Sequence, residues 1–223
     1  MKNILILLVL AVSVNISAQE TIEKTIGEFK TVKVYDLINL KMKKSDENKV
    51  IISGDNRKDV QVINKNGKLK IRMKLEESYD GNDTVVILHY TSVDVIDANE
   101  GANVLVEDPI EQFEIDLKTQ EGGEITAELK TNYANIRAVT GGIINASGSS
   151  KNQDISIYTG GVFNGEDLIT EDTEVSINAG GEAYIHATEH VEVRIKAGGD
   201  VFIYGNPKLV DENRVLGGRI KRM

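Results

Sequence analysis

Two stretches of the chain are built alike: Ile177-Asn178-Ala179-Gly180-Gly181-Glu182-Ala183 and Ile195-Lys196-Ala197-Gly198-Gly199-Asp200-Val201. In each stretch a Gly-Gly pair separates two runs in which apolar residues alternate with polar ones. Alternation with a period of two is typical of a β-strand with one buried face. A glycine pair between such runs indicates a sharp corner, because a tight bend needs a positive φ angle or a close approach of two backbones.

The same glycine pair recurs six times at a nearly constant interval. The pairs are Gly122-Gly123, Gly141-Gly142, Gly160-Gly161, Gly180-Gly181, Gly198-Gly199 and Gly217-Gly218. The steps between their first glycines are 19, 19, 20, 18 and 19 residues. Gly101-Ala102, which lies 21 residues before the first pair, is a degenerate candidate for a seventh. Such regular spacing is the signature of a repeat architecture, in which each repeat stacks on the last.

Positions at odd distances from the glycine pairs are predicted to face the core. Five positions before the first glycine stand Leu117, Ile136, Ile155, Val175 and Val193, and three after it stand Ile125, Ile144, Phe163, Ala183, Val201 and Ile220. Each strand would pair with its equivalent in the next coil, about 4.8 Å away. The predicted fold class is all-β, a parallel β-helix (solenoid) of about 19 residues per coil with Gly-Gly corners. An antiparallel sandwich is the alternative, but its hairpins would show varied turn residues and spacing.

The N-terminus has the layout of a secretory signal peptide. A lysine at position 2 precedes nine apolar residues, from Ile4 to Val12, and a polar, small-residue segment ends at Ala18. The apolar run is shorter than the roughly 20 residues of a membrane-spanning helix. We therefore predict a signal peptide over residues 1–18 and export to the periplasm, the outer cell surface or the medium, with a signal anchor as the alternative.

Residues 19–223 are predicted to form a single β-helix domain that does not span a membrane. Irregular coils are expected over 19–116 and regular Gly-Gly repeats over 117–223. In the first part, the segments predicted as strands are 28–44, 49–53, 58–64, 68–74, 84–90 and 93–97. Asn66-Gly67 is a tight-turn signal, and residues 76–83 are predicted to form a polar loop.

The composition excludes several classes of site. The chain has 223 residues and a net charge of −9, with 26 Lys and Arg against 35 Asp and Glu. This balance argues against nucleic-acid binding, because phosphate contacts need clusters of Lys and Arg that the sequence does not show. The absence of cysteine excludes disulfides, Cys-based metal sites and thiol nucleophiles. No cofactor is predicted.

The repeated glycine turns at 141, 160, 180 and 198 make the sequence resemble the bacterial head GIN domain family, a domain of unknown function also described as a putative auto-transporter adhesin. The segments Asn66-Gly67-Lys68-Leu69-Lys70-Ile71, Ile203-Tyr204-Gly205-Asn206-Pro207 and Gly217-Gly218-Arg219-Ile220 contribute to the resemblance. It covers nearly the whole mature chain. It implies a right-handed β-helix of the pectin-lyase-like kind, secretion in a Bacteroidetes-type bacterium and an adhesive role.

Candidate catalytic and metal-binding residues are few. His186-Ala187-Thr188-Glu189-His190 matches a zinc-peptidase pattern, but that pattern needs a helix, and these residues are predicted to lie in a turn between strands. His89 is interpreted as an ordinary strand residue. The acidic pairs are Glu107-Asp108, Glu166-Asp167 and Glu171-Asp172. They are predicted to be solvated charges in connecting loops, so no catalytic or metal-binding residue is assigned.

One outward column suggests a binding surface. The fourth position after each first glycine is occupied by Thr126, Asn145, Asn164, Tyr184 and Phe202. Tyr184 and Phe202 would lie side by side outside the core, where exposed aromatic rings can contact a sugar or a protein. Packing under a loop or under the N-terminal half is the alternative.

The function predicted from the sequence is a secreted, non-enzymatic structural or adhesive cell-surface module, whose partner is a surface, glycan or protein. A carbohydrate-active enzyme (a polysaccharide lyase or hydrolase) and a periplasmic partner-binding scaffold are the alternatives. Self-association into a homo-oligomer through the last coil is a further expectation, because the end of a β-helix exposes unpaired strand edges.

Overall fold

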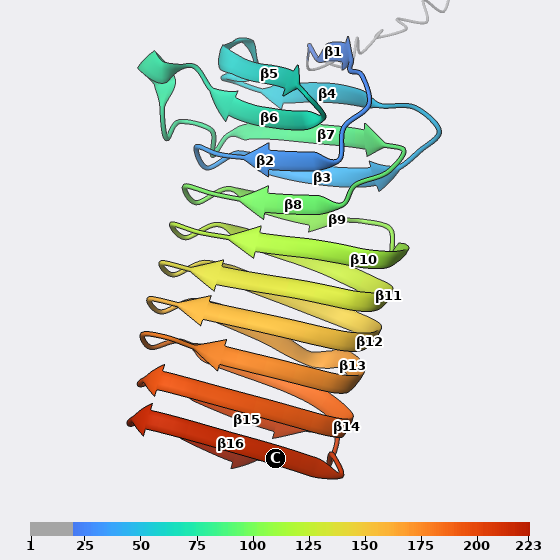
Figure 1. Cartoon of the computed structure of the whole chain (residues 1–223). Helices are drawn as coiled ribbons and strands as arrows, with labels where there is room; N and C mark the ends of the chain where they lie inside the picture. Colours follow the sequence, from blue (N-terminus) through green and yellow to red (C-terminus); the bar gives the residue numbers. More distant parts are fainter. Residues whose placement is uncertain (1–19) are drawn as a thin grey trace, which may run out of the picture.

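The structure, a computed structural model, describes residues 20–223 as a stack of parallel coils (Figure 1). The predicted signal peptide at 1–18 lies outside the described residues. The regular part is formed by β10 (Ile110–Thr119), β11 (Glu124–Val139), β12 (Ile143–Tyr158), β13 (Val162–Ile177), β14 (Glu182–Ala197), β15 (Asp200–Tyr204), β16 (Leu209–Leu216) and β17 (Arg219–Arg222). Each strand pairs in parallel with its equivalent one coil away. The coils turn in the right-handed sense in Figure 1, and the predicted fold class is confirmed.

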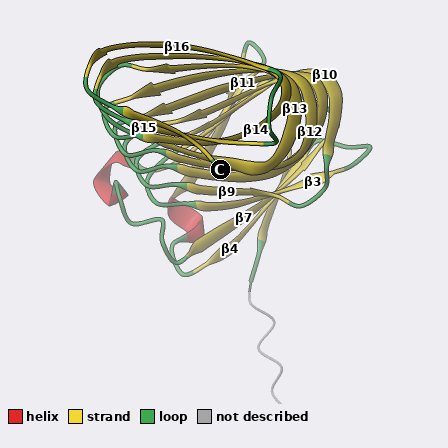
Figure 2. Cartoon of the chain, turned by 90° about the horizontal axis from the view of Figure 1, so that it is seen from below, coloured by secondary structure: helices red, strands yellow, loops and turns green. Residues whose placement is uncertain are grey.

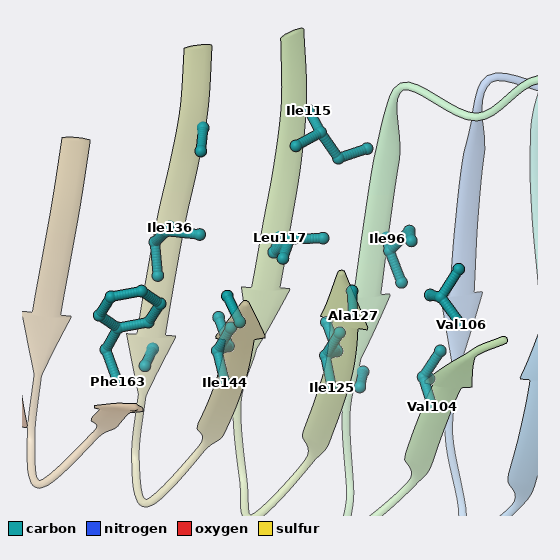
Figure 3. Packing of buried hydrophobic residues seen from close by; sticks show 14 of the residues in the cluster. Ile96, Val104, Val106, Ile115, Leu117, Ile125, Ala127, Ile136, Ile144 and Phe163 are labelled. Atoms are coloured by element: carbon teal, nitrogen blue, oxygen red, sulfur yellow. The ribbon is translucent and has the colours of Figure 1, made fainter. Parts of the chain in front are cut away.

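The register between coils follows the glycine spacing. Leu117, Ile136, Ile155, Val175 and Val193 are successive partners along one column, and Ile125, Ile144, Phe163, Ala183 and Val201 along another. All ten of these side chains are buried, and several are seen between the two walls of the solenoid in Figure 3. Each fully buried Ile, Leu, Val or Phe contributes about 1.5–3 kcal/mol. The predicted inward columns are therefore confirmed.

Each coil has two corners of different kinds (Figure 2). One corner is the glycine turn. From β11 to β14 the other is a bend inside an unbroken strand, since these four strands are each 16 residues long and continue through it. The prediction of a connecting loop is correct for Glu107-Asp108, which lies between β9 (Asn103–Val106) and β10, but it is wrong for the coils that follow. Glu166-Asp167 and Glu171-Asp172 lie within β13, and His186 and His190 lie within β14. A bend of a pleated strand keeps its ladder hydrogen bonds, so no separate turn sequence marks it.

The two glycines of a corner have different tasks. The first glycine of every pair has a positive φ angle, such as 74° at Gly160, and a Cβ atom added there would have no heavy atom within 4 Å. The second glycine touches the preceding coil instead. A Cβ atom on Gly161 would lie 2.4 Å from the carbonyl oxygen of Ala138. Gly101 also has a positive φ angle, 70°, which confirms it as a corner glycine.

The first half of the chain does not form coils in sequence order. The predicted strand over 28–44 is divided into β2 (Thr31–Val34) and β3 (Asn39–Lys44) by a turn in which Asp36 and Leu37 have positive φ angles. β2 pairs in parallel with β6 (Lys68–Met73) and β8 (Val95–Ala98). β3 pairs in parallel with β7 (Thr84–Tyr90) and β9 (Asn103–Val106). The coil of β2 and β3 thus lies between two coils that follow it in the sequence (Figure 1).

Antiparallel strands cover the N-terminal end of the solenoid. β4 (Lys49–Gly54) pairs with β7, β1 (Ile22–Thr25) pairs with β4, and β5 (Val60–Lys65) pairs with β6. Asn66-Gly67, with φ angles of 52° and 72°, forms the predicted tight turn between β5 and β6. Short 3₁₀ turns, η1 (Arg57–Asp59) and η2 (Leu75–Glu77), lie beside this end. The expected imperfect coils are therefore three coils, formed by β6–β7, β2–β3 and β8–β9, with a cap of antiparallel strands.

The other end of the solenoid finishes in a coil with charged inward positions. Glu212 follows Val193, Arg214 follows Ile195 and Arg222 follows Ile203 in the inward columns. Inward-pointing charges on edge strands oppose the addition of another strand, because a stacked coil would bury them. Among residues 20–223, no helix is long and apolar enough to cross a membrane.

The division of tasks within a corner is testable at Gly160 and Gly161. Gly160→Asn should cost at most about 1 kcal/mol, because Asn tolerates a positive φ angle and the site is open. Gly161→Ala should cost roughly 1–3 kcal/mol or more, because its Cβ would overlap the backbone of the previous coil. Chemical denaturation of both variants measures the difference. Equal stabilities would contradict this account of the corner.

Candidate ligand-binding face

Tyr184 on β14 and Phe202 on β15 lie side by side on the outside of the solenoid. Their ring centroids are 4.6 Å apart and their planes differ by 7°, so the rings are stacked. Both side chains are half-buried. The Tyr184 hydroxyl donates a hydrogen bond of 2.8 Å to the Glu182 carboxylate, which raises the pKa of Tyr184 above its ordinary value. The predicted adjacency of the two aromatics is confirmed, and their role as ligand contacts stays a prediction.

The same column continues away from the aromatics as a ladder of polar side chains. Asn164 Nδ2 donates to Asn145 Oδ1 at 2.7 Å, and Asn145 Nδ2 donates to Thr126 Oγ1 at 3.2 Å and to the Glu124 carboxylate at 2.7 Å. Asn164 is the register partner of Tyr184. The column therefore runs from amide groups directly onto aromatic rings. Over the four coil steps from Thr126 to Phe202 it extends about 19 Å.

A hollow of about 450 Å³ lies against the polar half of this column. It is lined by Thr126, Ala127, Asn145, Ala146, Ser147, Asn164, Glu166 and Asp167. Carboxylate, amide and hydroxyl groups all reach it, and no Lys, Arg or His is among the lining residues. We call the column and the hollow together, from Thr126 to Phe202 with Glu166 and Asp167, the aromatic–amide face.

The hollow exists because β13 carries extra residues at its bend. Gly165 pairs with Ile185 and Ile169 pairs with His186, so that residues 166–168 have no partner on β14. A bulge of this kind redirects side chains, and bulges are enriched beside functional sites. Against β12 the same bend contains one extra residue, between the pairs Asn145–Asn164 and Ser147–Asp167, and this residue accounts for the step of 20 between Gly160 and Gly180. The bulge places Glu166 and Asp167 at the hollow.

Gly165 lies at the start of the bulge for a packing reason. Its equivalents in neighbouring coils are Ala146 and Ile185, whereas a Cβ atom on Gly165 would lie 2.2 Å from the Phe163 ring. Phe163 is larger than its neighbours in the column and fills the space of the missing side chain. Within this coil, the large side chain of Phe163 compensates for the side chain that Gly165 lacks.

The zinc-peptidase pattern is not assembled into a metal site. His186 and His190 lie within one extended strand, β14, where residues four apart are not brought onto adjacent turns as they are in a helix. The His186 ring nitrogen Nδ1 lies 3.0 Å from the Glu166 carbonyl oxygen, and His190 Nε2 lies 2.9 Å from an Asp211 carboxylate oxygen. Within residues 20–223, no group of three or more His, Cys, Asp or Glu is arranged to hold a metal ion.

The other acidic pairs are dispersed over the surface. Glu107 pairs with Lys43 at 3.0 Å, and Asp108 accepts a hydrogen bond of 2.8 Å from the Lys44 backbone. Asp172 lines a separate hollow of about 260 Å³, together with Tyr133, Asp154 and His190. The structure does not bring the three predicted acidic pairs together.

A second aromatic pair was missed by the sequence analysis. Phe113 and Tyr133 have ring centroids 5.4 Å apart at an angle of 50°, and their side chains are 65% and 45% exposed. They lie 20 residues apart, close to one coil length, so the glycine spacing could have revealed their proximity. The outward residues predicted to be adjacent all lie near the first, glycine corner. These two rings lie at the second corner.

Most of the chain matches one known protein family. The family described as "Putative auto-transporter adhesin, head GIN domain" matches residues 28–207. The chain belongs to the head GIN domain family. The resemblance stated from the sequence is confirmed, and the family description suggests an exported or cell-surface protein with an adhesive role. No curated protein matches the sequence.

Solved structures share the fold of this head GIN domain at low identity. A putative adhesin from Bacteroides fragilis has a TM-score of 0.84 and 16% identity, covering 93% of this chain and 98% of that chain. A putative adhesin from Parabacteroides merdae has a TM-score of 0.72 and 18% identity, covering 92% and 95%. A putative lipid binding protein from Parabacteroides distasonis has a TM-score of 0.66 and 15% identity, covering 92% and 96%. At such identities the likeness shows the solenoid fold alone.

The volume exchange beneath the hollow is testable by a double-mutant cycle. Gly165→Ala alone should cost roughly 1–3 kcal/mol by overpacking against Phe163. Combined with Phe163→Leu, the same change should cost less than it does alone, giving a coupling of at least about 0.5 kcal/mol. Denaturant melts of the parent, the two single variants and the double variant provide the four values. Additive costs would show that the two side chains do not share one space.

Proposed function

We propose that this protein is an exported, non-enzymatic adhesion module that binds a glycan along the aromatic–amide face. The observation that carries the proposal is the Tyr184–Phe202 stack in register with the Asn145–Asn164 ladder. Ring atoms that the stack leaves accessible can contact the CH groups of a sugar ring, while amide, hydroxyl and carboxylate groups hydrogen-bond to sugar hydroxyls. The hollow beside the ladder supplies these polar groups from Asn145, Asn164, Glu166 and Asp167.

The rigidity of the face supports a binding role. Each residue of the column from Thr126 to Phe202 has a parallel ladder partner in both neighbouring coils. The stacked rings and the hydrogen-bonded amides are held in place before a ligand arrives, which lowers the entropic cost of binding. A ligand that follows the column would contact several coils at once.

A partner-binding scaffold is the second candidate, and the Phe113–Tyr133 pair favours it. Phe113 is 65% exposed and Tyr133 is 45% exposed, whereas Tyr184 and Phe202 are half-buried. Exposed aromatic pairs are enriched where proteins contact one another. This pair lies on different strands, β10 and β11, from the stacked pair, so separate variants distinguish the two surfaces.

The proposal predicts glycan binding that depends on the stacked aromatics. On a glycan array, the purified protein should bind a defined set of glycans, and Tyr184→Ala or Phe202→Ala should weaken binding by about tenfold or more, an aromatic contact being worth roughly 1–2 kcal/mol. Phe113→Ala is the matched control, because it also removes an exposed ring, and it should leave binding unchanged. Circular dichroism verifies the fold of each variant.

Two outcomes would contradict this proposal. Loss of binding in Phe113→Ala and Tyr133→Ala, but not in Tyr184→Ala, would move the ligand to the second aromatic pair and favour the scaffold. Turnover of a polysaccharide that is lost in Asp167→Asn would establish the carbohydrate-active enzyme instead, with the carboxylate at the hollow as its catalytic group.

A further inference from the structure

A second hollow, remote from the aromatic–amide face, lies on the outer surface of the hairpin formed by β5 and β6. It measures about 400 Å³ and is lined by Ile63, Lys65, Asn66, Lys68, Lys70 and Arg72. Four of these six residues are cations, and none is acidic. We call these six residues the cationic hollow. The hairpin of β5 and β6 lies at the capped end of the solenoid (Figure 1).

The hairpin geometry brings these cations together. Lys68, Lys70 and Arg72 alternate with buried residues on β6, so all three project from one face, about 7 Å apart along the strand. Lys65 is the direct cross-strand partner of Lys68, and Ile63 is the partner of Lys70. Directly opposed residues in an antiparallel pair are about 5 Å apart. The result is a closely spaced array of positive charge in a protein whose net charge is −9.

The array is not neutralised by the protein itself. Lys65, Lys68, Lys70 and Arg72 form no ion pair with any residue of 20–223, and the one side-chain bond among them is from Arg72 Nε to Gln61 Oε1 at 3.2 Å. Neighbouring lysines do have acidic partners: Lys30 contacts Asp94, Lys33 contacts Asp97 and Lys74 contacts Asp59. Like charges placed opposite one another destabilise a sheet. A departure from local stability rules of this kind is characteristic of functional surfaces.

We propose that the cationic hollow binds an extended polyanion that carries phosphate or sulfate groups. Lysine ammonium groups attract such groups as point charges, and the Arg72 guanidinium can hold two of their oxygens at once. Spacings of about 5 and 7 Å between neighbouring cations suit a chain with one anionic group per repeat. Ile63 adds an apolar contact for the carbon atoms between those groups.

The surroundings of the hollow favour a polymer over a flat bilayer. An adjoining hollow of about 290 Å³ shares Lys70 and Arg72 but is also lined by Asp36 and Glu100. The row of unpaired cations therefore ends at this second hollow. The exposed Leu75 beside it is followed by Glu76 and Glu77. A flat anionic bilayer would approach these carboxylates together with the hollow, whereas an extended chain can follow the cations alone. No aromatic residue lines the cationic hollow, so it has no platform for stacking nucleic-acid bases.

The test uses dextran sulfate and inorganic polyphosphate as probes, with uncharged dextran as the ligand control. The protein should bind both anionic probes and not dextran. Lys68→Gln combined with Lys70→Gln should weaken binding by about tenfold or more and reduce the slope of log Kd against log salt by roughly 1.4, at about 0.7 per lost contact. Lys151→Gln combined with Lys196→Gln removes the same charge elsewhere and should leave both values unchanged.

A third variant separates binding from folding. Lys65→Glu places a carboxylate opposite Lys68, so the melting temperature should stay level or rise while affinity for the polyanions falls. Vesicles with and without an anionic phospholipid, and single-stranded DNA, are added as alternative probes. Failure to bind either polyanion, equal loss in the Lys151 and Lys196 control, or stronger binding to the vesicles or the DNA than to the polyanions would overturn the proposal.

Discussion

The close approach of each second corner glycine to the backbone of the preceding coil is the constraint on which the regular half of this structure depends. A Cβ atom on Gly123, Gly142 or Gly161 would lie within 2.6 Å of atoms in the coil before it. Hydrogen bonds then repeat at the same place, since the residue after each second glycine donates to the second glycine of the previous coil, as Val162 does to Gly142 at 2.9 Å. With the corners stacked in this way, the strands on either side have one register available. That register places apolar residues inside and polar residues outside in every coil.

The candidate binding face arises where this regularity is interrupted. The corners before and after β13 keep their stacking, so the one residue by which this coil exceeds the coil before it is accommodated at the opposite bend, beside the residues 166–168 that have no partner on β14. The bulge carries two carboxylates to the outside, and the column beside it changes from amides to aromatics between Asn164 and Tyr184. A uniform solenoid would present a uniform surface, whereas this one has a distinct site. The scaffold and the site are therefore set by different residues of the same repeat.

Sequence reasoning succeeded where the determinant was local and repeated. The glycine pairs and the alternation around them predict the coil length, the inward columns and the adjacency of Tyr184 and Phe202. It failed where long-range placement decided the outcome. Nothing local to β2 and β3 indicates that they insert between β6–β7 and β8–β9, because each of these strands has the same alternating pattern and would fit any neighbouring coil. The cationic hollow was not predicted for a related reason. The pairing of β5 with β6 brings Lys65 beside Lys68, and the negative net charge of the whole chain gives no sign of this local cluster of cations.

The central claim, that the glycine corners define interchangeable 19-residue coils, is tested most directly by deleting one coil. Removing the 19 residues 142–160 joins Gly141 to Gly161 and recreates a Gly-Gly corner. In a solenoid each coil contacts only its neighbours, so the shortened protein should still unfold cooperatively, with its β-type circular dichroism retained and its stability reduced by about the contribution of one coil. The measurement is a denaturant melt beside that of a chain lacking only residues 142–151, which breaks the register. If the 19-residue deletion unfolded the protein as completely as the shorter deletion, the coils would not be the units of this fold.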